Sequence, residues 1–79
     1  MSYIFNKSNY DLAKKNNDLE LFRGDEISRR IAKVYPLSAQ IALLMDKEEK
    51  PYEYQQYQTF RQRVKLEVDS EMISMEYNY

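Results

Sequence analysis

The sequence of 79 residues contains no cysteine, no histidine and no tryptophan. These absences exclude disulfides, thiol nucleophiles, imidazole general bases and the common zinc sites. A single glycine excludes glycine-rich phosphate loops, and the carboxylates do not follow the spacing of a calcium loop. No apolar run approaches the about 18 residues of a membrane span, and the first residues do not form a secretion signal. We therefore expect an intracellular protein without enzymatic activity, cofactor or metal.

Charge of one sign is also lacking, because twelve basic and thirteen acidic residues give a net charge of −1. Such a chain is not a general binder of polyanions. What the chain does contain is aromatic surface, with eight tyrosines and three phenylalanines. A domain of this length buries only about 60% of the surface that its unfolded chain exposes. Because tyrosine is enriched in interfaces, we expect part of this aromatic surface to contact a protein partner.

Helical spacing dominates the sequence after its one glycine. A short helix through about residue 16 is expected near the N-terminus, with Ser8 or Asn9 as its N-cap. Residues 19–22 alternate as a strand would, but a lone strand has nothing to pair with. We therefore predict an all-α fold in one small domain over residues 1–79. It divides into an N-terminal docking segment (1–24), a helical body (25–75) and a tail (76–79).

The helical body is expected to begin with a helix near residues 25–35. The tripeptide Arg23-Gly24-Asp25 predicts a turn that ends in a helix N-cap at Asp25. Pro36 should end this helix, because proline disfavours helical geometry in the residue before it.

Two further helices are predicted to form a C-terminal helical hairpin, at about 38–48 and 51–75. Ser38 is the candidate N-cap of the first, and Pro51 is tolerated in the first turn of the second. The apolar stripe of the shorter helix consists of Ile41, Leu44 and Met45.

The long helix of the hairpin carries two apolar faces. On one face, Arg61 and Glu71 interrupt the stripe, either at its edge or as polar groups that fix a helix–helix register. A helix packed on one side has a polar opposite side, so two apolar faces predict two partners. The shorter helix can cover one face, and the other face is available to the N-terminal segment or to another subunit. We expect a charged residue at Leu66 to disrupt association while helicity persists. The first face comprises Tyr54, Tyr57, Val64, Val68, Met72 and Met75, and the second Tyr52, Thr59, Leu66 and Ile73. The predicted partner-binding residues are Tyr52, Leu66, Ile73, Met75, Tyr77 and Tyr79.

Residues 26–45 also have the spacing of a DNA-binding helix-turn-helix. Pro36 stands where such turns usually carry glycine, and proline cannot adopt a positive φ. The second helix offers Gln40 as its one plausible base-reading residue and has no cation before Lys47. DNA binding therefore stays an alternative, and nucleic acid is not the expected partner.

Residues 31–65 contain several features in a fixed order. They are a basic helix end, a tyrosine, a serine-capped apolar segment, lysine-proline, an acidic residue and spaced tyrosines. This pattern resembles small uncharacterised late-gene proteins of tailed phages and prophages of Gram-positive bacteria. The match spans 35 of the 79 residues and departs from the pattern at Pro36 and Ala39. The resemblance implies a setting, phage late gene expression in the cytoplasm of a bacterial host or in the virion, rather than a mechanism. The matching positions are Arg30, Lys33, Tyr35, Ser38, Ile41 through Leu44, Lys50, Pro51, Glu53, Tyr54 and Tyr57.

Together these features predict a non-catalytic protein–protein interaction module. The resemblance implies a minor virion or tail-assembly component of a phage, with phage structural proteins or copies of itself as partners. The alternative is a small phage-encoded regulator or host-factor inhibitor, with DNA binding through residues 26–45 as one form of it.

Overall fold

The computed structural model describes residues 3–77, which form four α-helices and no strand. The all-α class predicted from the sequence is therefore confirmed. The helices are α1 (Lys7–Lys15), α2 (Leu19–Val34), α3 (Leu37–Met45) and α4 (Pro51–Tyr77).

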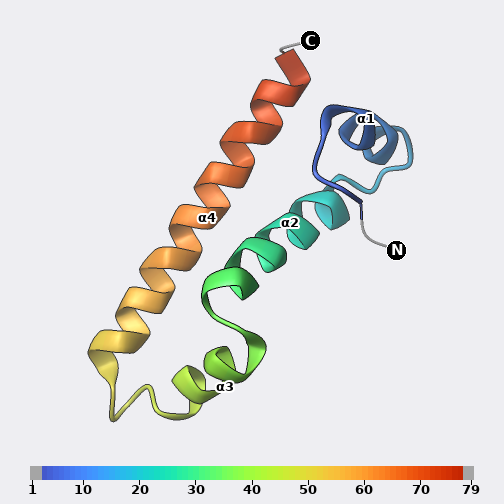
Figure 1. Ribbon diagram of the computed structural model, residues 1–79. Helices are drawn as coiled ribbons and strands as arrows, with labels where there is room; N and C mark the ends of the chain where they lie inside the picture. Colours follow the sequence, from blue (N-terminus) through green and yellow to red (C-terminus); the bar gives the residue numbers. More distant parts are fainter. Residues whose placement is uncertain (1–2, 78–79) are drawn as a thin grey trace.

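The molecule is elongated because α4 runs along its whole length. Figure 1 shows α2 beside α4, with α1 and α3 at opposite ends of the molecule. The principal extents are 46 × 24 × 18 Å and the radius of gyration is 14.8 Å. A compact domain of this length would have a radius of gyration of about 11.6 Å. Much of each helix therefore stays close to the surface.

Local capping explains the ends of several helices. The side-chain oxygen of Asn6 accepts a hydrogen bond from the backbone N–H of Asn9 at 2.8 Å, so the N-cap of α1 is Asn6 and not Ser8 or Asn9. Pro51 is the first residue of α4, as predicted. α3 begins at Leu37, one residue before the predicted cap, and has no side-chain cap.

α2 begins six residues earlier than the sequence predicted. Gly24 and Asp25 lie inside this helix, so the predicted turn and N-cap at Asp25 are wrong. The ambiguous segment 19–22 forms its first turn, and Phe22 there is only 1% exposed. The Arg23 guanidinium also donates to Asp69 of α4, with Nε 2.5 Å from Oδ1. These tertiary contacts offset the about 1 kcal/mol that a glycine costs inside a helix.

Two clusters of buried side chains form the core of the described chain. The N-terminal cluster joins α1 to the start of α2, and the central cluster joins α2 to α4. Phe5 and Met72 pack against both clusters and connect them. The N-terminal cluster comprises Tyr10, Ala13 and Phe22, and the central cluster Ile27, Ile31, Tyr57, Val64 and Val68.

The inner face of α4 lies where the sequence predicted it, but its main neighbour differs. Tyr57, Val64 and Val68 are buried, as expected for the inner stripe. However, α2 makes the most extensive contact with α4, and α3 touches it much less. The inner face of α4 is therefore covered mainly by α2, and the short helix of the hairpin covers only a smaller part of it through Leu43.

Candidate protein-interaction surfaces

α3 is an apolar helix that the rest of the described chain leaves largely uncovered. Seven of its nine residues are apolar, and the twelve positions 34–45 contain no charged residue. Within residues 3–77, none of the α3 side chains is buried. Soluble monomers rarely expose large contiguous apolar patches, so an uncovered helix of this composition is a candidate contact surface.

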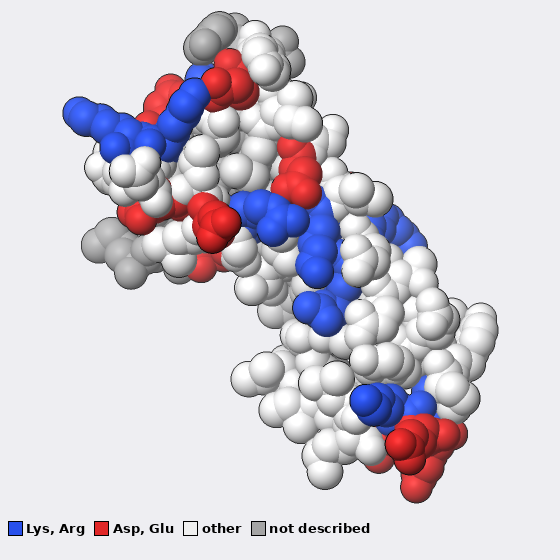
Figure 2. Space-filling model, turned by 180° about the vertical axis from the view of Figure 1, so that it is seen from behind, with Lys and Arg blue, Asp and Glu red and all other residues white. Residues whose placement is uncertain are grey.

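The exposed side of α3 is a single stripe, which we call the α3 apolar face. Its four members are spaced i, i+4, i+7 and i+8, a pattern that places them on one side of a helix. Figure 2 shows an uncharged area at this end of the molecule, next to a small group of charged side chains. The α3 apolar face consists of Leu37 (70% exposed), Ile41 (49%), Leu44 (50%) and Met45 (79%).

Two residues on the other side of α3 hold the helix to the body. Leu43 packs against the central cluster. The Gln40 amide donates to the backbone oxygen of Tyr35 at 2.8 Å, and its side-chain oxygen accepts from the Tyr57 hydroxyl at 2.7 Å. These contacts turn the α3 apolar face outward. They also occupy Gln40, the one base-reading candidate, so the structure gives no support to the helix-turn-helix alternative.

The arginines of α2 are likewise engaged within the chain. Arg30 makes two hydrogen bonds to Glu71 of α4, at 2.6 and 2.9 Å, and a third to Glu26. Arg29 pairs with Glu26 as well. The Arg30 guanidinium holds the pKa of Glu71 below its ordinary value. Glu71 therefore serves a helix–helix contact inside the chain, with its charge still partly in water.

A hollow of about 300 Å³ adjoins the α3 apolar face. It lies between α2 and α3, and Leu37 belongs both to its lining and to the exposed stripe. Arg61 of α4, whose guanidinium lies 5.6 Å from the centre of the Tyr57 ring, borders it. The hollow could accept an apolar side chain from a partner. Its lining consists of Ile27, Ser28, Ile31, Ala32, Leu37, Gln40 and Arg61.

The structure leaves the predicted outer face of α4 open. Tyr52, Leu66 and Ile73 are 72%, 70% and 61% exposed. Tyr77 is also exposed, whereas Met75 is half-buried against the N-terminal cluster. Tyr79 lies outside the described residues.

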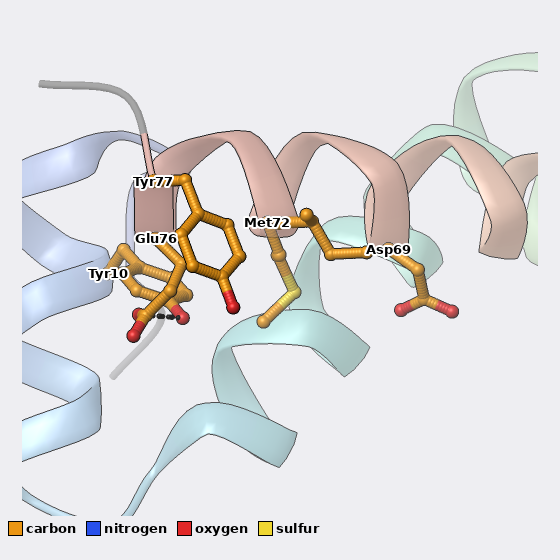
Figure 3. Close-up of a pocket in the computed structure, with 6 residues that line it drawn as sticks. Tyr10, Asp69, Met72, Glu76 and Tyr77 are labelled. Atoms are coloured by element: carbon orange, nitrogen blue, oxygen red, sulfur yellow. Dashed lines mark hydrogen bonds between the residues drawn. The ribbon is translucent and has the colours of Figure 1, made fainter.

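A second hollow, of about 390 Å³, lies at the C-terminal end of α4. Figure 3 shows the side chains of Tyr10 and Tyr77 next to Glu76, with Met72 one turn away along α4. The Tyr10 hydroxyl donates to Glu76 at 2.7 Å, and this hydrogen bond raises the pKa of the hydroxyl. Lys14 also pairs with Glu76. Both carboxylates that line this hollow, Asp69 and Glu76, are therefore paired with side chains of the same chain.

The sequence analysis found the stripe of α3 but did not say what would cover it. In the structure Ile41 and Leu44 are about half-exposed, and Met45 is 79% exposed. The run of twelve uncharged residues was the available signal of a contact surface.

Within residues 3–77, no helix combines the length and apolar character needed to cross a membrane. The same residues contain no group of three or more potential metal ligands placed to hold an ion. Comparisons of the chain with family models, curated proteins and solved structures found no match.

Proposed function

We propose that the protein is a non-catalytic protein–protein interaction module. The observation that carries the proposal is the exposure of α3, an apolar helix without charge in a chain that is 32% charged. Burying one large aliphatic side chain stabilises a contact by about 1.5–3 kcal/mol. A partner that covers the four side chains of the α3 apolar face would therefore gain appreciable binding energy.

The outer face of α4 supports a second contact. Tyr52, Leu66 and Ile73 stay exposed and, together with the exposed Thr59, recur every seven residues. They offer a narrow line of side chains about 30 Å long to another chain. The proposed module thus has two separate surfaces, one on α3 and one on α4.

The test begins with affinity capture of tagged protein from cells that naturally carry the gene. Any protein recovered in stoichiometric amount is then purified and titrated directly with the wild type and with two variants, Ile41→Glu and Leu66→Glu. Glu67→Gln, an exposed change beside Leu66, is the matched control.

At least one charged variant should weaken binding tenfold or more, while Glu67→Gln binds as the wild type does. Circular dichroism should show unchanged helicity in all variants, because the altered side chains are exposed. If both charged variants bind normally, or if no protein associates with the wild type, the interaction module is refuted. If Leu66→Glu unfolds the chain, the outer face of α4 belongs to the core.

We also propose that the setting is a tailed phage, as a minor virion or tail-assembly component. This part of the proposal is supported by the sequence resemblance alone. Phage particles from the source strain can be searched by mass spectrometry for the tryptic peptide from Val34 to Lys47. Stoichiometric recovery supports a structural component. Presence in infected cells but not in particles points to an assembly factor or regulator, and absence from every phage context refutes the setting.

A further inference from the structure

We infer that the α3 apolar face binds the same face of a second copy of this chain, with the two α3 helices antiparallel and Ile41 at the two-fold axis. The inference rests on the proposed function and names one partner for one of its two surfaces. The outer face of α4 remains free in this arrangement for a different protein.

The absence of charge makes the α3 apolar face self-complementary. In a two-fold interface each patch meets itself, so any charge near the axis would meet an identical charge. The twelve positions 34–45 contain none, although charged residues make up 32% of the chain. The one charged side chain that lines the adjoining hollow, Arg61, lies over the ring of Tyr57.

The two ends of the face are complementary in shape. Met45, the most exposed member, projects at the C-terminal end, whereas the hollow of about 300 Å³ lies beside Leu37 at the N-terminal end. Leu37 and Met45 are each four residues from Ile41, about 6 Å along the helix axis. Antiparallel pairing about Ile41 therefore places each Met45 at the hollow of the other copy. Methionine is flexible and suits an irregular apolar space.

The charges that flank α3 favour the antiparallel direction. The exposed Lys33 precedes the helix, while residues 46–50, which follow it, carry three carboxylates and two lysines and so a net charge of −1. Antiparallel pairing brings Lys33 of one copy toward this net-negative segment of the other, and does so at both ends. Parallel pairing would place like charges together and align the helix dipoles unfavourably.

The size of the face predicts a reversible dimer. Nine helical residues span about 13.5 Å. Even with the hollow filled, the contact falls below the about 1,600 Å² that stable complexes bury. We therefore expect dissociation constants in the micromolar range.

The experiment is sedimentation equilibrium of the purified full chain up to about 1 mM, a concentration at which a micromolar dimer is nearly complete. The wild type should approach twice its mass of 9.6 kDa. Ile41→Glu and Ile41→Lys should each weaken dimerisation at least tenfold, because each places two like charges at the axis. An equimolar mixture of the two variants should dimerise again, and Leu66→Glu should dimerise as the wild type does.

Each other outcome overturns the inference in a recognisable way. A wild type that stays monomeric removes the second copy as the occupant, while binding of a different protein would still support the proposed function. Loss of the dimer in Leu66→Glu but not in Ile41→Glu would place self-association on α4. If the equimolar mixture of Ile41→Glu and Ile41→Lys failed to dimerise while both variants kept the thermal stability of the wild type, Ile41 would not lie at a two-fold axis.

Discussion

Replacing Val68 with alanine tests whether the inner face of α4 carries the stability of the fold. Val68 is 0% exposed and lies in the central cluster between α2 and α4. The substitution removes two buried methyl groups, about 1.6 kcal/mol by transfer energy. Incomplete collapse of the cavity adds to this loss, and the higher helix propensity of alanine offsets about 0.5 kcal/mol. We expect a net loss of about 2 kcal/mol in the free energy of unfolding.

Such a loss is large for a domain of this size. At about 0.05–0.15 kcal/mol per residue, the whole chain is stabilised by about 4–12 kcal/mol. A loss of about 2 kcal/mol should lower Tm by about 8–16 °C. Thermal and urea unfolding, followed by circular dichroism at low protein concentration, measure both quantities without a contribution from self-association.

Leu66→Ala is the matched control, because Leu66 lies on the same helix two residues away but is 70% exposed. Its free energy of unfolding should change by no more than about 0.5 kcal/mol. If Leu66→Ala destabilised the protein as much as Val68→Ala, the orientation of α4 described above would be refuted. A neutral Val68→Ala would refute it equally.

Three further predictions follow from single contacts. Arg30 holds the pKa of Glu71 below its ordinary value, so the ion pair stabilises the fold above about pH 4.5 and this stabilisation is lost as the pH falls. Lowering the pH from about 5 to 3 should therefore reduce the free energy of unfolding of the wild type more than that of Glu71→Gln. Gly24→Ala should raise the free energy of unfolding, measured in urea, by about 0.5–1 kcal/mol, because Gly24 is helical and the added Cβ would meet no atom within 4 Å beyond its chain neighbours and the nearby backbone of the helix. A loss of stability would contradict the helical assignment. Asn6→Ala should lower the free energy of unfolding by about 1 kcal/mol and speed backbone hydrogen exchange in α1 more than in α4. An equal increase in exchange in both helices would contradict the role of Asn6 as a local cap.

Periodicity predicted those parts of the fold that depend on neighbouring residues in the chain. The inner stripe of α4, with Val64 and Val68, and the helix start at Pro51 both appear in the structure. A long stripe at helical spacing and a proline in the first turn are local signals, and no distant contact opposes them here.

The predicted start of α2 failed because a distant contact outweighed a local signal. Gly24 followed by Asp25 is a good helix start, but the burial of Phe22 extends the helix to Leu19. The ion pair between Arg23 and Asp69 joins positions 46 residues apart, which no short-range pattern contains.

The exposure of α3 also depends on distant contacts. The spacing of Ile41, Leu44 and Met45 showed that they share a face, but not whether another helix would cover it. That outcome depends on the contact of α2 with the inner face of α4, and on Gln40 and Leu43, which orient α3. Surface contacts of this kind become predictable only once the packing of the other helices is known.

The elongated shape has a consequence for how bound partners would be arranged. α4 contains 27 residues and measures about 40 Å, and the ion pairs Arg23–Asp69 and Arg30–Glu71 brace it against α2. α3 sits at one end of this braced pair and the C-terminal hollow at the other (Figure 1). Two partners bound at these two ends would therefore be separated by about the length of α4 and not joined by a flexible linker.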